Sequence, residues 1–196
     1  MVATPSTMLP LGTPAPDFQL ADTSGRVGSR DDFAAEPALL VMFICNLCPY
    51  VRHVADEIAR VGRDYQDQGV AIVAVNSNDI IQQPGDDPVA MAQFAAERGF
   101  VFPYLYDETQ SVAAAYRAAC TPDFFLFDAD RRLVYRGQLD GARPSNEVPI
   151  DGRDLRAALD ATLAGKPIPE PQLASLGCNI KWKPGAEPEY ASLGQG

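Results

Sequence analysis

The fold is decided by the stretch Ala38-Leu39-Leu40-Val41-Met42-Phe43-Ile44, which is followed at once by Cys45-Asn46-Leu47-Cys48-Pro49. An unbroken apolar run of this length is typical of a strand buried on both faces, as in a parallel sheet with helices on each side. Apolar residues then recur at spacings of three and four, which predicts one face of a helix. That stripe is Val51, Val54, Ile58, Val61 and Tyr65. The sequence thus predicts a strand, a Cys-x-x-Cys pair and a helix in direct succession.

The opposite face of this helix is polar and is expected to be solvated. It carries His53, Asp56, Glu57, Arg60 and Asp64. His53 is the only histidine and the obvious candidate base for the cysteines. It lies about 12 Å further along the helix, at about 1.5 Å per residue, so we expect a surface histidine among acids instead.

The rest of the chain alternates strands and helices. Val70–Val75 is a second buried strand, and Asp87-Pro88 is an N-cap and N1 pair for the next helix. Phe124–Phe127 and Leu133–Arg136 form an antiparallel hairpin, and Asp151 is expected to cap a last helix. This order predicts an α/β fold with a central mixed β-sheet and helices on both faces.

Composition excludes several classes of function. The chain has 196 residues, 46% of them hydrophobic, which suits one α/β domain with extensions. Its net charge of −10 repels phosphate backbones and anionic lipid, so neither nucleic acid nor membrane is expected as a partner. No apolar run is long enough to span a bilayer, and residues 1–10 lack a signal-peptide pattern. We therefore expect a cytoplasmic protein.

The position of Cys45 and Cys48 favours thiol-disulfide chemistry. A helix N-terminus carries partial positive charge and unpaired N–H groups, which favour a thiolate. The first thiolate forms a mixed disulfide with a substrate, and the second thiol resolves it. We predict that Cys45 faces outward and attacks, while Cys48 is more shielded and resolves. The helix begins either with Asn46 as N-cap and Pro49 at N3, or with Cys48 as N-cap and Pro49 at N1.

Zinc binding and a structural disulfide are the competing interpretations of this pair. Four cysteines are too few for a disulfide-stapled scaffold of this length. Zinc needs two further ligands, and the other cysteines, Cys120 and Cys178, are isolated in the sequence. We expect neither a metal nor a cofactor.

Several longer motifs resemble a known family. They are Gly12-Thr13-Pro14-Ala15-Pro16-Asp17-Phe18-Gln19-Leu20, Cys45-Asn46-Leu47-Cys48-Pro49-Tyr50-Val51, Asn76-Ser77-Asn78-Asp79, Cys120-Thr121-Pro122-Asp123-Phe124-Phe125-Leu126-Phe127-Asp128, Tyr135-Arg136-Gly137-Gln138-Leu139-Asp140, and Gly177-Cys178-Asn179-Ile180-Lys181-Trp182-Lys183. Together they resemble the thioredoxin superfamily, in its redoxin branch of alkyl hydroperoxide reductase and TlpA-like proteins, and within it a peroxiredoxin-like group with a Cys-x-x-Cys motif. The resemblance implies a thioredoxin-like domain over residues 11–183, with an N-terminal redoxin-type extension and a C-terminal tail. Residues 1–10 and 184–196 are expected to be loose termini.

The resemblance also implies a substrate-binding loop. Thr121 and Pro122 match the loop whose cis-proline packs against the dithiol, and whose preceding residue offers its backbone to substrate as if adding a strand. Cys120 is a candidate third redox thiol or a small buried apolar residue, of which burial is favoured. For Cys178 and Trp182 we expect a structural docking role. Arg143 either binds an anionic group or, as is commoner, is an exposed loop arginine.

The implied function is that of a thiol-disulfide oxidoreductase that reduces or isomerises disulfides. Its partners are a disulfide-containing protein or small molecule and an electron-donor thiol system. A thiol peroxidase with an antioxidant role is one alternative, and a non-enzymatic redox sensor or metal-holding protein is another. Ala38 and Met42 stand where a peroxidase has proline and threonine before Cys45, which argues against peroxidase activity. Leu47 cannot donate a charge, so a less depressed Cys45 pKa is expected.

Overall fold

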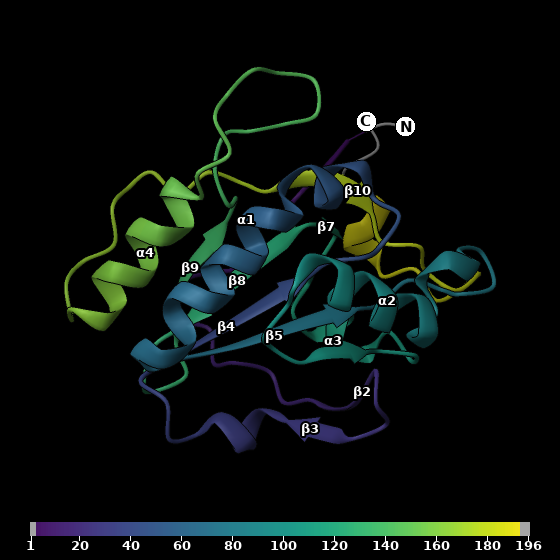
Figure 1. Ribbon diagram of the computed structural model, residues 1–196, viewed down its shortest axis with the longest axis horizontal. Helices are drawn as coiled ribbons and strands as arrows, with labels where there is room; N and C mark the ends of the chain where they lie inside the picture. The colour runs from purple at the N-terminus through teal and green to yellow at the C-terminus, as the bar shows by residue number, and fades with distance from the viewer. Residues whose placement is uncertain (1–2, 193–196) are drawn as a thin grey trace.

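The computed structural model describes residues 3–192 and is built on a mixed sheet of seven strands (Figure 1). The strands lie in the order β3-β2-β6-β5-β4-β8-β9, with β4 parallel to β5 and antiparallel to β8. Their bounds are β2 Gln19–Asp22, β3 Val27–Ser29, β4 Ala38–Phe43, β5 Val70–Asn76, β6 Tyr104–Tyr106, β8 Asp123–Phe127 and β9 Leu133–Gly137. The predicted central mixed sheet is confirmed.

Helices cover both faces of this sheet. They are α1 Pro49–Tyr65, α2 Pro88–Arg98, α3 Ser111–Ala115 and α4 Arg153–Leu163, with short 3₁₀ turns at Arg30–Phe33, Gln66–Gln68, Pro84–Asp86 and Glu189–Ser192. The central strand β4 contacts both helix layers, because its alternate side chains point to opposite faces of the sheet. Leu40 and Met42 pack with α1, α2 and α4, whereas Leu39 and Val41 pack with α3 and the chain ends. Within residues 3–192, no helix combines the length and apolarity that crossing a bilayer requires.

Helix α1 begins with Cys48 as N-cap and Pro49 at N1, which decides between the two predicted starts. The prediction for its polar face was wrong at Glu57, which is only 2% exposed. Glu57 Oε1 lies 2.8 Å from Nε of Arg156 on α4, and Arg60 makes a second ion pair with it. The periodicity of α1 alone cannot show that α4 packs over this face.

The caps of the later helices were predicted in part. Asp87 caps α2 as expected, with its side chain accepting a hydrogen bond from Ala90 N at 2.8 Å. The cap of α4 is Gly152, and not Asp151. Gly152 has a φ of 64°, which a glycine adopts without steric cost, and Asp151 instead forms an ion pair with Arg153.

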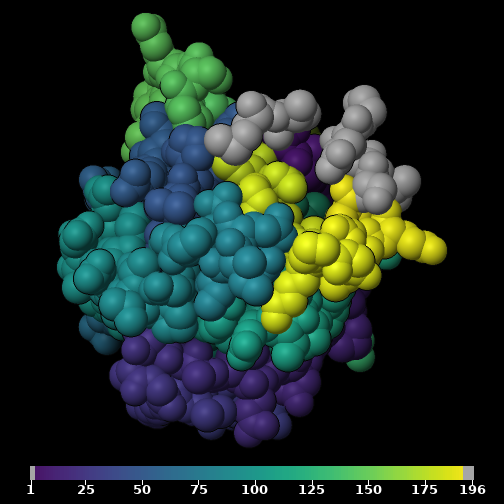
Figure 2. All heavy atoms as spheres, turned by 90° about the vertical axis from the view of Figure 1, so that its right-hand side faces the viewer, coloured from purple at the N-terminus to yellow at the C-terminus, as the bar shows by residue number. Residues whose placement is uncertain are grey.

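The two chain ends are docked onto the domain, so the expectation of loose termini was wrong for much of both. Strand β1 (Thr4–Pro5) pairs with β10 (Leu176–Asn179), and β10 pairs with β7 (Cys120–Thr121), which gives a second sheet of three strands. Further along, Tyr190 Oη donates to Ala113 O and Ala118 O at 3.2 and 3.3 Å. Residues 1–2 and 193–196 of the predicted loose ends lie outside the described residues. The C-terminal segment, yellow in Figure 2, lies over the surface of the domain.

Strand β10 approaches β7 so closely that only glycine fits at one position. A Cβ atom at Gly177 would lie 1.9 Å from Thr121 O, a distance that real Cβ contacts do not show. The neighbouring atom belongs to the backbone, so it cannot swing away as a flexible side chain would. Gly177 therefore sets how near the C-terminal strand comes to the Thr121-Pro122 loop.

We predict that Gly177→Ala displaces β10 and lowers the free energy of unfolding by about 1–3 kcal/mol, the usual cost of overpacking. Trp182, the only tryptophan, is buried in the same segment, so its fluorescence emission should shift to longer wavelength. Gly28→Ala is the matched control, because its added Cβ would lie 3.7 Å from Leu105, an ordinary contact. Unchanged emission and melting temperature in Gly177→Ala would contradict this account of the docking.

Candidate active site

Cys45 and Cys48 lie between the end of β4 and the start of α1, against the Thr121-Pro122 peptide, which is cis as expected. Cys45 Sγ is 3.3 Å from Thr121 Oγ1, and Cys48 Sγ donates a hydrogen bond to Thr121 O at 3.1 Å. The structure therefore brings together the four residues predicted from the sequence. It does not show the expected outward Cys45, since Cys45 and Cys48 are 3% and 4% exposed.

The two thiols have opposite electrostatic settings. Hydrogen bonds from Cys178 and Cys45 lower the pKa of Cys48. Cys48 is the N-cap residue of α1, and the Val51 N–H in the first turn of that helix lowers this pKa further. A hydrogen bond to Cys48, burial and the nearby Asp86 raise the pKa of Cys45 well above its usual value. The direction at Cys45 agrees with our expectation. The attacking role predicted for Cys45 stays a prediction: the hydrogen bonds from neighbouring thiols favour a thiolate at Cys48, whereas the hydrogen bond from Cys48 to Thr121 O exists only while Cys48 is a thiol.

The third cysteine at the site is Cys178, and not Cys120. Cys178 on β10 lies directly opposite Thr121 in the antiparallel pairing and hydrogen bonds to Cys48. Cys120 is fully buried, with its Sγ 3.7 Å from Pro122 O, and burial raises its pKa well above the usual value. Burial of Cys120 was expected, whereas the contact of Cys178 with the dithiol was not. The docking role of its segment is observed as well.

Asp86 holds the turn between the two cysteines, and the sequence analysis missed it. Its Oδ1 accepts a hydrogen bond from Asn46 N at 2.7 Å, and its Oδ2 accepts one from Asn78 Nδ2 at 2.8 Å. Tyr104 Oη donates to Asn46 Oδ1 at 3.1 Å from the other side. Asp86 is fully buried, and burial raises its pKa. The only signal in the sequence was its place beside the Asp87-Pro88 cap.

The thiols share a cavity of about 90 Å³. Its lining residues are Cys45, Leu47, Cys48, Pro49, Asn78, Gln83, Asp86, Cys178 and Lys181. Leu47 is 45% exposed, so it presents apolar surface next to the buried sulfurs. Within residues 3–192, no group of three or more His, Cys, Asp or Glu side chains is placed to hold a metal ion. The cavity therefore offers thiol chemistry beside one ammonium and one carboxyl group.

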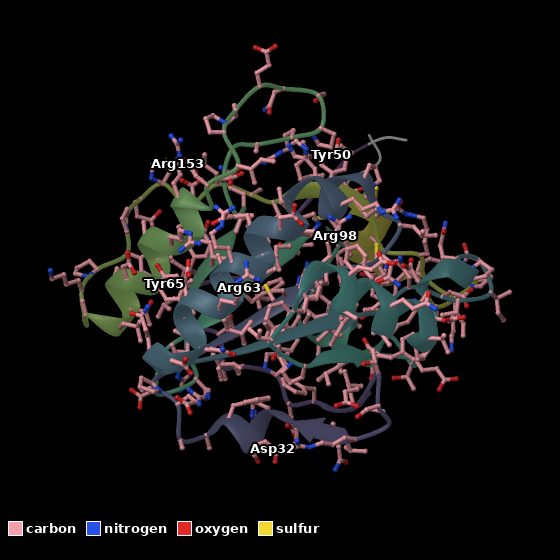
Figure 3. The ribbon with its side chains drawn as sticks, viewed as in Figure 1. Asp32, Tyr50, Arg63, Tyr65, Arg98 and Arg153 are labelled. Carbon is pink, nitrogen blue, oxygen red and sulfur yellow. The ribbon has the colours of Figure 1, made fainter. Side chains whose placement is uncertain are left out.

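The backbone edge that was predicted to receive substrate is already occupied. Thr121 pairs with β10 of the same chain, so an added strand at this edge would have to replace β10. Beside it, Tyr50 at the start of α1 (Figure 3) lines a small hollow with Pro122 and Arg143. Arg143 is not the exposed loop arginine we expected, because it is half-buried and donates to Asp140 O and Ala142 O.

His53 lies outside this site. It does not line the thiol cavity, which agrees with the prediction that it is not the base. It is half-buried rather than fully solvated, and its Nε2 atom is buried without a hydrogen-bond partner. The cysteines therefore have no imidazole to tune them.

We predict that Cys48 carries the thiolate of the reduced protein. The thiolate absorbance in the ultraviolet should persist at neutral pH in Cys45→Ser and disappear in Cys48→Ser. The reason is that Cys48 accepts hydrogen bonds from its neighbours and caps α1, whereas Cys45 lies beside the Asp86 carboxyl group. Loss of the absorbance in Cys45→Ser alone would return the attacking role to Cys45.

A second buried acid, Asp123, makes stability depend on pH. Burial raises its pKa to about 7, and its Oδ1 atom has no hydrogen-bond partner. The folded state therefore holds a proton that the unfolded state releases near the ordinary value of 3.8. This contribution is fully present below about pH 4 and is lost as the pH rises through about 7, with a slope of up to about 1.4 kcal/mol per pH unit.

Replacing Asp123 tests this directly. We predict that Asp123→Asn, measured by urea denaturation from pH 4 to 8, removes the decline in stability over that range. The free energy of unfolding of the variant should therefore rise relative to that of the wild type as the pH rises. Parallel curves for the two proteins would show that Asp123 is ionised in the fold.

Similar proteins indicate the family to which this chain belongs. Residues 11–136 match the AhpC/TSA family. The thiol-disulfide oxidoreductase ResA of Geobacillus thermodenitrificans is 30% identical over 132 residues, which cover 66% of this chain and 70% of that protein. A crystal structure of an uncharacterized conserved protein from Geobacillus kaustophilus is 54% identical, with a TM-score of 0.93 over 95% of this chain and 99% of that one.

A more distant structure shows the fold. The thioredoxin domain of a thiol-disulfide oxidoreductase from Bacteroides vulgatus superposes with a TM-score of 0.58 at 17% identity, over 76% of this chain and 96% of that one. The thioredoxin-like fold expected from the sequence is therefore confirmed. With its match over residues 11–136, the chain belongs to the AhpC/TSA family.

Proposed function

We propose that this protein is a thiol-disulfide oxidoreductase that reduces or isomerises disulfides with Cys45 and Cys48. The observation that carries the proposal is the contact between these two thiols at the N-terminus of α1, against the cis Thr121-Pro122 peptide. Similarity to ResA, which is named a thiol-disulfide oxidoreductase, supports it.

The proposed reaction begins at Cys48. Its thiolate attacks one sulfur of the substrate disulfide, forms a mixed disulfide and releases the first substrate thiolate, which takes up a proton. The Cys45 thiol then loses its proton and attacks Cys48 Sγ. This step releases the second substrate thiol and leaves a Cys45–Cys48 disulfide. The substrate gains two electrons, and an external dithiol system returns them to the protein.

The environment of the dithiol supports this division of labour. While Cys48 is a thiolate, its charge and its hydrogen bond keep Cys45 protonated. Once Cys48 is bound in a mixed disulfide, that charge is gone and Cys45 loses its proton more easily. The resolving thiol is thus activated only when its target exists.

The partners follow from this chemistry. We propose disulfide-containing proteins or small molecules as substrates and an electron-donor thiol system as reductant, with the cytoplasm as the working compartment because it keeps such a dithiol reduced. The net charge of −10 favours substrates that are neutral or cationic.

The surroundings of Cys45 and Cys48 do not favour peroxide reduction. Met42, three residues before Cys45, is a fully buried side chain of β4 and offers no hydroxyl group to a peroxide. The residue three before Cys48 is Cys45 itself.

Reduction of insulin disulfides with dithiothreitol as electron donor tests the proposal. The wild type should accelerate the reaction, and Cys48→Ser should return it to the rate of dithiothreitol alone because the attacking sulfur is missing. Cys120→Ala is the matched control, since Cys120 is a buried cysteine outside the thiol cavity, and it should keep the wild-type rate. A wild type no faster than Cys48→Ser would refute the proposed activity.

A further inference from the structure

Cys48 has two thiol neighbours, and only one belongs to the Cys-x-x-Cys motif. Cys45 approaches it from the end of β4, and Cys178 approaches it from β10. All three line the same cavity. Cys178 is 6% exposed, so it is part of the interior of the site rather than a surface thiol. A second cysteine in contact with the attacking sulfur is not required by the two-thiol reaction.

The position of Cys178 is fixed by the fold. Strand β10 is paired on one edge with β1 and on the other with β7. The absence of a side chain at Gly177 lets β10 come close to Thr121 O. Just after the C-terminal end of the strand, Lys181 N donates to Asn78 Oδ1 at 2.9 Å, and the same Asn78 side chain donates to Asp86. Residues at both ends of β10 therefore hold the Cys178 side chain against Cys48.

This placement is the one that a bound peptide would use. A peptide that adds to a sheet edge pairs its backbone with the edge strand and points alternate side chains into the site. Strand β10 does this at β7, with Cys178 opposite Thr121, whose carbonyl accepts the hydrogen bond of Cys48. The chain thus presents a cysteine of its own where a substrate strand would lie.

We propose that Cys178 is a second resolving thiol, so that Cys48 forms two alternative disulfides, one with Cys45 and one with Cys178. This rests on the proposed function and deepens it. Both side chains line the same cavity of about 90 Å³, and Cys178 lies opposite Thr121, whose carbonyl oxygen is 3.1 Å from Cys48 Sγ, so a side-chain movement can bring the two sulfurs to the S–S bond length of about 2.05 Å. The bond would tie the C-terminal strand to the start of α1.

The step balances without a further reactant. After Cys48 has taken up one half of a substrate disulfide, the Cys178 thiol loses its proton and attacks Cys48 Sγ. The Cys48–Cys178 bond forms, the bond from Cys48 to the substrate sulfur breaks, and the departing thiolate takes up a proton. Cys45 stays a thiol. The hydrogen bond to Cys48, burial and the Cys48 charge raise the pKa of Cys178, and the ammonium group of Lys181 on the same wall opposes that rise. Once Cys48 is bound in a mixed disulfide its charge is gone, so Cys178 loses its proton more easily.

The same chemistry connects the two disulfides. Attack of Cys178 on a Cys45–Cys48 disulfide forms Cys48–Cys178 and releases Cys45 as a thiolate, which receives the proton from Cys178. The number of disulfides is unchanged, and no outside oxidant is needed. The second arrangement leaves Cys45 free to react while the protein stays oxidised.

A single-turnover reaction of the reduced protein with 4,4′-dithiodipyridine tests this proposal. The probe is a neutral disulfide, so the negative charge of the protein does not repel it. It releases one coloured thiopyridone when Cys48 forms the mixed disulfide and a second one when that bond is resolved. In Cys45→Ser we expect both equivalents and a peptide cross-link between Cys48 and Cys178 by mass spectrometry. Adding Cys178→Ala should stop the reaction after the first equivalent, with the pyridyl adduct retained on Cys48.

The matched control is Cys45→Ser with Cys120→Ala, which should behave like Cys45→Ser alone. The proposal is overturned if Cys45→Ser stops at the adduct, or if its double variant with Cys178→Ala still releases two equivalents. Trp182 emission reports whether the tail stays docked. If Cys178→Ala undocks the tail, the presence or absence of the Cys48–Cys178 cross-link in Cys45→Ser tests the proposal instead. Failure of the proposed function looks different, because wild type and Cys48→Ser would then release thiopyridone at the same rate.

Discussion

The structure depends on the main chain of Thr121, which is shared between the dithiol and the C-terminal strand. Its carbonyl accepts a hydrogen bond from Cys48 while Cys48 is a thiol, its hydroxyl lies beside Cys45, and its backbone pairs with β10. The cis bond to Pro122 joins this strand to β8, which lies between β4 and the edge strand β9 of the large sheet. A shift of Thr121 would therefore change its contacts with Cys45, with Cys48 and with strand β10. This coupling also makes Gly177 important, since it faces the same carbonyl from the other side.

The charges around the dithiol determine which thiol can ionise. Two buried carboxyl groups, Asp86 below the Cys-x-x-Cys turn and Asp123 beyond Pro122, disfavour further negative charge nearby. Hydrogen bonds from neighbouring thiols are then what make one thiolate acceptable at Cys48. Because a buried cluster tolerates one negative charge far better than two, Cys45 and Cys178 hold their protons while Cys48 is ionised. The two neutral thiols are thus available to resolve the mixed disulfide after Cys48 has attacked.

The sequence was sufficient for features that depend on local periodicity. Strand β4, the cysteines and α1 follow from an apolar run and a stripe of spacing three and four, and the cap of α2 follows from Asp87-Pro88. The placement of Thr121-Pro122 at the dithiol came from family resemblance, since no local pattern relates positions so far apart. Glu57, Cys178 and the docked termini were missed because each depends on packing between distant segments. A buried acid paired with Arg156 looks the same in sequence as a solvated one.

The docked tail also limits how a substrate reaches Cys48. With β10 in place, the cavity of about 90 Å³ is too small for a peptide strand, and the edge of β7 is closed. Small disulfides can approach past Leu47, whose exposed side chain is the apolar part of the rim. A protein disulfide needs β10 to move, and β10 is a strand of four residues with two paired positions on each edge. A bond between Cys48 and Cys178 would lock that strand down. The choice of resolving thiol would then decide whether the edge of β7 can open to the next substrate.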